Sequence, residues 1–301
     1  MNVRIVTDST AYLPAGLVRE HAIAVVPLHV VVGGVERVEG VDITAHQVAQ
    51  ALREHTVVTT SRPAPEVFLE TYRRLADEGA TGIVSVHLSG QMSGTVESAR
   101  MAAAEAPLPV EVIDSETIGM AMGYAAVSGA HAAAAGAAPA EVRAAVERRL
   151  EHARVLFYVH TLEHLRRGGR IGAASALLGS ALSIKPILTV RGGRIVPVEK
   201  VRTAARAIAR IETLTVEQVR SGGLMVDLAI HHLDDADRAE QLAEHLRARV
   251  PAAREVRIVE LGAVVGAHVG PSTLAIAVSP RPGEPVGGER READTGIEGD
   301  P

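Results

Sequence analysis

The residues of this chain best suited to holding a ligand lie in one short segment, Ser89-Gly90-Gln91-Met92-Ser93-Gly94-Thr95. It follows an apolar stretch at residues 82–86 that predicts a buried strand, and it precedes an Ala-rich stretch at 95–105 that predicts a helix. Hydroxyl groups next to the free N–H groups of a helix N-terminus favour an anion. The segment contains no general base, no partner for a nucleophile and no spacing typical of metal ligands. We therefore expect it to bind a carboxylate or a phosphate, although Ser93 also fits a simple helix cap.

Three other polar segments lie at the ends of expected strands: Thr7-Asp8-Ser9-Thr10, Thr59-Thr60-Ser61-Arg62-Pro63 and Gly266-Ala267-His268-Val269-Gly270-Pro271. Ligands of parallel α/β sheets usually lie beyond the carboxyl ends of the strands, so each segment is a candidate part of one site. Each also has a purely structural explanation. The acid or hydroxyl of the first segment fits a helix cap, and His268 fits a fixed position in a loop. Ser61 with Pro63 fits the N-cap and first turn of the next helix, which leaves Thr60 free for a ligand.

A hydrolase is the main alternative to a binding protein. Ser93 and His268 would be its nucleophile and base, but the chain lacks the G-x-S-x-G turn that commonly exposes a catalytic serine. It also lacks a P-loop, and no G-x-G-x-x-G opens the first helix. The adjacent His231 and His232 would point to opposite faces of an extended segment, so we expect no metal. The absence of cysteine excludes disulfides and thiolate chemistry.

Composition narrows the class of protein further. With 301 residues, of which 47% are hydrophobic, the chain can form two globular domains. An expected strand begins at residue 3 and no apolar run approaches the length of a membrane span, so we expect a cytoplasmic protein without a signal peptide. Aromatic residues make up only 2%, which argues against nucleic acid as a partner. Residues 162–210 contain ten Lys or Arg and two Glu, a local balance of +8, which suits an acidic partner or a phosphate as well as a solvated surface.

Strand-like and helix-like stretches alternate, which predicts an α/β fold: a mainly parallel sheet with helices on both faces, plus a second, smaller α/β domain. In the first part we expect strands at residues 3–7, 24–32, 83–86, 110–114 and 155–159, and helices at 45–54, 64–78, 95–104, 120–135 and 139–153. In the second part we expect helices at 162–167, 173–182, 203–214 and 235–249, a hairpin at 184–198, and strands at 225–230, 255–260 and 273–278. The expected domains are 1–160 and 161–280, followed by a disordered tail at 281–301.

Eight short motifs together resemble one known family, the DegV family. They are Thr7-Asp8-Ser9-Thr10, Thr60-Ser61-x-Pro63, Ser93-Gly94-Thr95, Asp114-Ser115, Thr161-Leu162-x-x-Leu165-x-x-Gly168-Gly169-Arg170-Ile171, Lys185-Pro186-Ile187, Lys200-Val201-Arg202 and His268-x-Gly270-Pro271. They occur in the family's order and span residues 3–279. Any one of them is weak evidence, but eight in register are specific. The family includes the fatty-acid-binding subunit of bacterial fatty acid kinase.

The resemblance implies a two-domain α/β protein that buries a long-chain fatty acid between its domains. A separate ATP-dependent kinase subunit would phosphorylate the bound carboxylate to an acyl phosphate for phospholipid metabolism. This chain would then have no catalytic residue and no cofactor besides its ligand, and its only contact with a membrane would be transient. Carried over to this sequence, the ligand-binding residues are Thr60, Ser61, Ser93, Gly94, Thr95 and His268. Arg170 and Arg202 would meet the kinase or the new phosphate.

Two positions depart from the family pattern. Arg62 replaces a frequent Gln, and it either adds a charge near the carboxylate or points to solvent. Ser272 replaces a frequent Gly after Gly270-Pro271. A third hypothesis, weaker than carrier and hydrolase, is a protein–protein adaptor that uses the basic segment at 162–210.

Overall fold

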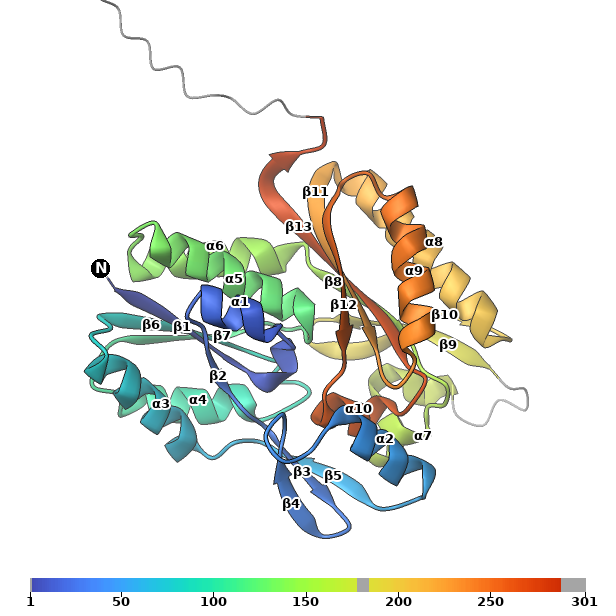
Figure 1. Cartoon of the computed structure of the whole chain (residues 1–301), viewed down its shortest axis with the longest axis horizontal. Coiled ribbons are helices and arrows are strands. Elements are labelled where there is room, and N and C mark those ends of the chain that lie inside the picture. Colours follow the sequence, from blue (N-terminus) through green and yellow to red (C-terminus); the bar gives the residue numbers. More distant parts are fainter. Residues whose placement is uncertain (1, 178–183, 288–301) are drawn as a thin grey trace, which may run out of the picture.

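A four-stranded parallel sheet forms the first half of the computed structural model, which describes residues 2–177 and 184–287 (Figure 1). Its order is β2-β1-β6-β7, with β1 at Val3–Asp8, β2 at Ala24–Val26, β6 at Gly82–His87 and β7 at Val110–Asp114. All six residues of β6 are buried, as expected for a central parallel strand covered on both faces. Helices α3 (Pro65–Asp77) and α4 (Thr95–Ala104) cover one face, and α5 (Met120–Ala134) and α6 (Pro139–Glu151) cover the other.

A six-stranded mixed sheet forms the second half, with the order β10-β9-β8-β13-β11-β12. Its strands are β8 (Arg154–Tyr158), β9 (Lys185–Arg191), β10 (Arg194–Val201), β11 (Leu224–His232), β12 (Ala253–Glu260) and β13 (Leu274–Pro285). Helices α8 (Ala204–Gly222) and α9 (Ala236–Arg249) pack on its outer face. Helices α5 and α6 also contact β13, so they lie between the two sheets.

A small antiparallel sheet, β4-β3-β5, lies below the other two in Figure 1. It consists of β3 (His29–Val32), β4 (Val35–Val38) and β5 (Val58–Ser61), and it packs with α2 (Ala45–Arg53) and α10 (Ala263–Val269). The remaining short elements are η1 (Ser9–Ala11), α1 (Ala15–Glu20), α7 (Glu163–Arg167) and η2 (Gly172–Leu177). Because α10 contacts both β5 and α7, three segments far apart in the sequence meet here.

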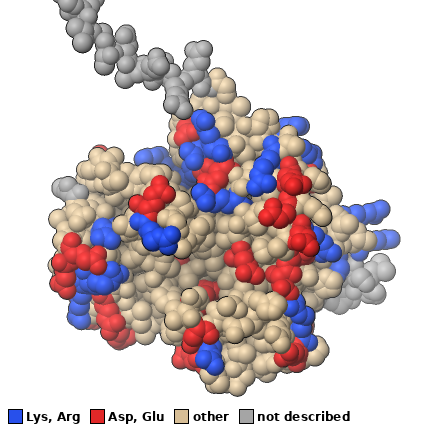
Figure 2. All heavy atoms as spheres, viewed as in Figure 1, with Lys and Arg blue, Asp and Glu red and all other residues tan. Residues whose placement is uncertain are grey.

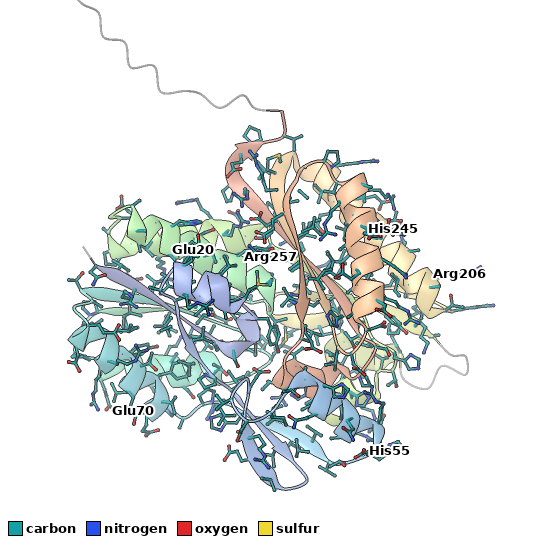
Figure 3. The ribbon with its side chains drawn as sticks, viewed as in Figure 1. Glu20, His55, Glu70, Arg206, His245 and Arg257 are labelled. Atoms are coloured by element: carbon teal, nitrogen blue, oxygen red, sulfur yellow. The ribbon has the colours of Figure 1, made fainter. Side chains whose placement is uncertain are left out.

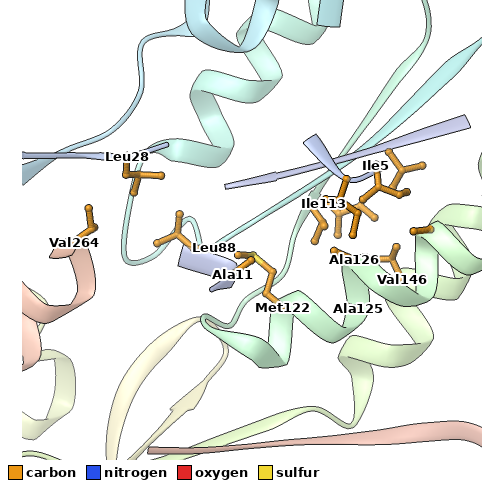
Figure 4. Packing of buried hydrophobic residues seen from close by; sticks show 14 of the residues in the cluster. Ile5, Ala11, Leu28, Leu88, Ile113, Met122, Ala125, Ala126, Val146 and Val264 are labelled. Carbon is orange, nitrogen blue, oxygen red and sulfur yellow. The ribbon is translucent and has the colours of Figure 1, made fainter. Parts of the chain in front are cut away.

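Small residues allow close packing between the first sheet and α5. Ala125 and Ala126 of α5 are buried against β1 and β7, where Figure 4 shows them beside Ile5 and Ile113. A Cβ atom on Gly129 would come within 2.6 Å of Val146, so α5 and α6 approach too closely for a side chain there. The same apolar cluster continues through Leu28, Leu88 and Val264, which also line the cavity described below.

The predicted α/β fold is confirmed, and several expected elements agree closely with the structure. Helix α4 and strand β7 have the expected bounds, and the hairpin is formed by β9 and β10. Charged side chains such as Glu70 on α3 and Arg206 on α8 point outward (Figure 3). Acidic and basic side chains are interspersed on the face shown in Figure 2. No helix in residues 2–177 and 184–287 is long and apolar enough to cross a membrane.

Three expectations about elements were wrong. The strand expected at 24–32 is two strands in different sheets, because Pro27 lacks an N–H group and interrupts the ladder between β2 and β3. The helix expected at 173–182 is the 3-10 helix η2 up to Leu177, and residues 178–183 lie outside the described residues. The tail expected from 281 begins as strand, since β13 runs to Pro285, and residues 288–301 are likewise outside the described residues.

The chain changes sheets before the boundary expected near residue 160. Strand β8 ends at Tyr158 and pairs with β9 and β13, so the crossing from the first sheet to the second lies between α6 and β8. A buried ion pair joins the two halves at this crossing: Arg149 of α6 contacts Asp227 of β11, and its Nε donates to Ser279 Oγ of β13 at 2.7 Å. Arg281 adds a bond from its Nη2 to Asp227 Oδ1 at 2.9 Å.

Candidate ligand-binding site

One cavity lies where β5, the loop after β6, the turn after α7, α10 and the inner face of the six-stranded sheet meet. Its volume is about 180 Å³. Most of its lining is apolar, with Leu28, Phe157, Leu165 and Val190 among the residues of its wall. Six of its polar lining residues are linked to one another by side-chain contacts or as neighbours in the chain, and this set is here called the polar end: Thr60, Ser61, Arg62, Ser93, Arg170 and His268.

Thr60 and His268 meet at the polar end. The Oγ1 of Thr60 lies 2.8 Å from Nε2 of His268. The other face of the imidazole packs on the turn after α7, because a Cβ atom on Gly168 would lie only 2.0 Å from Nδ1 of His268. Burial, and after it the charge of Arg170, lowers the pKa of His268 to about 4. The imidazole is therefore neutral at pH 7, and it can act as a hydrogen-bonding group but not as a cation.

Helix α10, which carries His268, is anchored at its start by the side chains of Glu39 and Tyr12. The carboxylate of Glu39 accepts a hydrogen bond from Val264 N at 2.8 Å and contacts the hydroxyl of Ser9. The hydroxyl of Tyr12 accepts a further bond from Val265 N at 3.3 Å. Burial raises the pKa of Glu39, and these donors oppose that shift. The anchor ties the start of α10 to the first strand's end and to the end of β4.

The two halves of the loop after β6 have different contacts: the first half bonds other protein groups, and the second half lines the cavity. The hydroxyl of Ser89 donates to Gly193 O at 2.8 Å, at the tip of the β9–β10 hairpin. The carboxylate of Asp114 accepts from Gly90 N at 3.1 Å, so an internal anion already occupies that N–H group. Only the second Ser-Gly step, Ser93-Gly94, lines the cavity. The expectation that the whole loop holds an anion is thus corrected to its second half.

Arg170 lies in the turn after α7, fixed by backbone oxygens. Its Nε donates to Met92 O at 2.9 Å and its Nη1 donates to Gly168 O at 2.6 Å. The turn has Gly169 at φ +71, a left-handed conformation that glycine adopts without strain. The sequence motif around Gly168-Gly169-Arg170 therefore directs a guanidinium group to the cavity and clears the space for His268.

Five of the six expected ligand-binding residues line the cavity: Thr60, Ser61, Ser93, Gly94 and His268. Thr95 does not line it, because it is fully buried at the start of α4, where its Oγ1 lies 2.8 Å from Ser93 Oγ. Arg170 lines the cavity, whereas Arg202 is exposed just after β10 and lies outside the lining.

The helix caps expected at three positions are not formed. Asp8 caps the 3-10 helix η1, where its Oδ1 accepts from Thr10 N at 3.0 Å, and not the helix expected after Leu13-Pro14, since the N-cap of α1 is Pro14. Ser61 is no cap because it belongs to β5, and α3 starts later, at Pro65. Ser93 is no cap either, because Gly94 is the N-cap residue of α4 and no side chain bonds the helix start. His268 lies on helix α10 and not in a loop.

A metal site is not formed by the described residues. No group of three or more His, Cys, Asp or Glu side chains in residues 2–177 and 184–287 could hold a metal ion. His231 lines the cavity, and its Nε2 accepts from Met120 N at 3.1 Å. Burial lowers the pKa of His231 to about 4, so it is a neutral part of the wall.

The geometry does not assemble a hydrolase. In the described part of the chain, the Ser93 hydroxyl contacts Thr95 and the His268 imidazole contacts Thr60. The Nδ1 of His268 has no hydrogen-bond partner, so no carboxylate orients the ring as in a Ser-His-Asp triad. The polar end therefore lacks both the nucleophile–base contact and the orienting carboxylate of a Ser-His-Asp triad.

Comparison with known proteins agrees with the motifs. The family model described as "Uncharacterised protein, DegV family" matches residues 2–281. The chain belongs to the DegV family. A DegV domain-containing protein of Streptomyces coelicolor is 53% identical over 280 residues, covering 93% of this chain and 99% of the relative.

Two solved DegV structures resemble this DegV protein over nearly their whole length. A Thermus thermophilus DegV family protein, described by its fatty acid binding, has a TM-score of 0.88 at 34% identity, covering 93% of this chain and 100% of that one. DegV of Bacillus subtilis, described as a fatty acid binding protein, has a TM-score of 0.85 at 33% identity, with the same coverage. The fold expected from the resemblance is thereby confirmed.

Most of the apolar wall of this DegV protein was not identified from the sequence. Phe157 and Val190 point from β8 and β9 into the cavity, and Leu28 comes from the link between β2 and β3. These residues follow no regular spacing in the sequence. The sequence shows only that the chain is rich in Val, Leu and Ile, as every globular core is. Arg62 lines the cavity although it was not among the predicted ligand-binding residues, and its signal in the sequence was its departure from the family pattern.

Proposed function

We propose that this DegV protein binds a long-chain fatty acid, with the acyl chain against the apolar wall and the carboxylate at the polar end. The observation that carries the proposal is the single cavity in which an apolar wall ends in three hydroxyls, a neutral imidazole and two guanidinium groups. Each buried CH₂ contributes about 0.8 kcal/mol, so a long chain supplies most of the affinity. The hydroxyls of Thr60, Ser61 and Ser93 offset the cost of removing a carboxylate from water. The fatty acid binding of the Thermus and Bacillus relatives supports the same ligand class.

The protein is a substrate-presenting subunit and not an enzyme. A separate ATP-dependent kinase subunit would act on the bound fatty acid. One carboxylate oxygen attacks the γ-phosphorus of ATP, the bond from that phosphorus to the bridging oxygen breaks, and ADP leaves. The product is an acyl phosphate for phospholipid metabolism, formed in the cytoplasm. The separate contacts of Ser93 and His268, which leave no nucleophile–base pair between them, support this division of labour.

Mass spectrometry of the ligand tests the binding proposal directly. The purified protein is extracted with organic solvent before and after incubation with mixed C14–C20 fatty acids, and the extract is analysed. We expect close to one fatty acid per chain, whose length and unsaturation then identify the preferred ligand. An empty extract after incubation would contradict fatty acid binding. Turnover of a p-nitrophenyl acyl ester that is lost in Ser93→Ala would support the hydrolase instead.

The kinase partnership needs its own test. Arg170→Glu and Arg202→Glu proteins, loaded with oleic acid, are mixed with ATP and a DegV-partner kinase subunit, and ADP release is followed. We expect both charge reversals to slow phosphorylation, with Arg202→Glu retaining normal oleic acid affinity because it lies outside the cavity lining. Unchanged rates in both variants would remove the docking role of these residues and, with it, the adaptor role of the basic segment.

A further inference from the structure

Arg62 is positioned at the polar end by close contact with Gly94. It directly follows β5, whose last residues are Thr60 and Ser61. A Cβ atom on Gly94 would lie 2.1 Å from Nη1 and 2.9 Å from Cδ of Arg62, so the side chain lies flat against the Gly94 backbone. The guanidinium thus occupies the space that any other residue at 94 would need. Although Arg62 is an exposed residue, it lines the cavity.

The polar end carries two cations and no acid. Among the described residues, the cavity lining includes Arg62 and Arg170 and contains neither Asp nor Glu. Arg170 uses its Nε and Nη1 on backbone oxygens, which leaves Nη2 for a ligand. Both guanidinium groups rest on the same short stretch, Arg170 on Met92 and Arg62 on Gly94. Ser93 lies between Met92 and Gly94, so both guanidinium groups contact the backbone of its immediate neighbours.

Three other arginines of the basic segment have acid partners, whereas Arg194 donates to Gln91 Oε1 of the loop after β6. Arg166 and Arg167 pair with Glu163 at 2.7 Å, and Arg210 pairs with Glu199 at 2.7 Å. Within residues 2–177 and 184–287, no ion pair of this kind joins Arg62 or Arg170 to an acid. One carboxylate, that of Glu36, is hydrogen-bonded to the polar end: its Oε1 accepts from Ser61 Oγ at 3.2 Å and lies 3.0 Å from His29 Nδ1. It contacts the polar end from outside the cavity lining.

We propose that Arg62 adds a second guanidinium group to the one that the family resemblance already assigns to the phosphate, that of Arg170, and that Arg62 makes the site prefer an acyl phosphate over the free fatty acid. This rests on the proposed function and specifies which charge state of its ligand is held best. A carboxylate carries one negative charge and leaves the pair half neutralised, whereas a phosphoryl group carries close to two. Guanidinium groups bind phosphate oxygens in a bidentate, directional manner, which suits two of them on one phosphoryl group. Arg62 is therefore a specificity-determining residue that keeps the product bound until it is handed on.

Binding of two stable probes by wild type, Arg62→Gln and Arg62→Lys tests the inference. The probes are oleic acid and the β-ketophosphonate analogue of its acyl phosphate (the phosphonate probe), in which a CH₂ group replaces the bridging oxygen and prevents hydrolysis. Affinities are measured by isothermal titration with delipidated protein. Loss of one charge-assisted contact predicts that Arg62→Gln weakens phosphonate binding about 10-fold or more and oleic acid binding about 3-fold or less. Arg62→Lys keeps the charge but loses the bidentate geometry, so it should fall between wild type and Arg62→Gln.

Arg73→Gln is the matched control, since Arg73 is an exposed arginine of α3 outside the cavity lining and the substitution removes the same charge. It should bind both probes as wild type does. An equal loss of both probes in Arg62→Gln, or no loss of either, overturns the inference while leaving fatty acid binding in place. Failure of wild type to bind oleic acid would instead contradict the proposed function itself. Thermal unfolding of each variant verifies that the fold is retained.

Discussion

Thr60 and His268 are separated by 208 positions in the sequence, yet their side chains lie 2.8 Å apart at the head of the cavity. Thr60 belongs to strand β5 of the small antiparallel sheet, and His268 belongs to the short helix α10 between the last two strands. The pair joins the first part of the chain to the second at the point where the ligand's carboxylate is expected. Four predictions follow from this arrangement and from the contacts that support it.

The ring of His268 depends on an empty space at Gly168. A Cβ atom there would lie 2.0 Å from Nδ1 and 2.8 Å from Cε1, so Gly168→Ala should push the ring away from Thr60. We expect oleic acid binding to weaken about 10-fold, as for the loss of one charge-assisted contact. The measurement is isothermal titration with delipidated protein. Gly16→Ala is the matched control because a Cβ atom on Gly16 would meet nothing within 4 Å. Wild-type affinity in Gly168→Ala would show that the ring position does not matter for binding.

Ser93 should bind the carboxylate without acting as a nucleophile. Its hydroxyl lies at the cavity and contacts Thr95 Oγ1 at 2.8 Å, within reach of a ligand at the start of α4. Ser93→Ala removes one hydrogen bond to a charged group, worth about 1.5–3 kcal/mol, so the dissociation constant of oleic acid should rise about 10-fold or more. Ser221→Ala on α8, whose hydroxyl bonds only Gln218 O at 3.0 Å, is the control. Equal affinities in the two variants would contradict the assignment of Ser93.

Stability should depend on pH through the neutral state of His268. The folded protein keeps this imidazole unprotonated down to about pH 4, whereas an unfolded histidine takes up a proton near pH 6.5. Between these values the unfolded state binds more protons, so the free energy of unfolding is highest above pH 6.5 and falls as the pH falls toward 4. The loss due to this one group is at most about 3 kcal/mol.

Urea unfolding between pH 4 and 8 measures this effect. His268→Gln should show a flatter profile than wild type, while a residual slope should remain because burial also lowers the pKa of His231 to about 4. His55→Asn replaces an exposed histidine far from the cavity lining (Figure 3) and should keep the wild-type profile. Identical slopes in wild type and His268→Gln would argue against a neutral buried imidazole at this position.

The ion pair between the two halves should be costly to break. Asp227 is 3% exposed and receives Arg149, with Arg281 bound at 2.9 Å. Asp227→Ala would leave the Arg149 guanidinium, 5% exposed, without its carboxylate. We expect a loss of about 3–5 kcal/mol in the free energy of unfolding, measured by urea denaturation. Arg281→Gln should cost less, because Arg281 is partly exposed and Arg149 still pairs with Asp227. A loss below 1 kcal/mol in Asp227→Ala would contradict a structural role for the pair.

Local patterns were enough to predict the regular elements of the first part. The bounds of α4 and β7 agree because an Ala-rich stretch and an apolar stretch are each flanked by Gly, Pro or Asp residues that end them. Strand β5 was read as a loop before a helix, since its four residues Val-Thr-Thr-Ser carry the polar side chains of a turn. Pairing with β3 in a partly exposed sheet makes it a strand, and that pairing is not visible in a window of four residues.

The sequence by itself determined the class of the fold, the family and the residues with anion-binding side chains, because these depend on residue types and on spacings of a few positions. The tertiary structure decided which of those side chains share one cavity. It turned Ser89 toward the hairpin tip, Thr95 into the core and Arg62 onto Gly94. The physical reason is that contacts such as Thr60 with His268 depend on how sheets and helices pack, and packing is set by shape complementarity across the whole core rather than by neighbours along the chain.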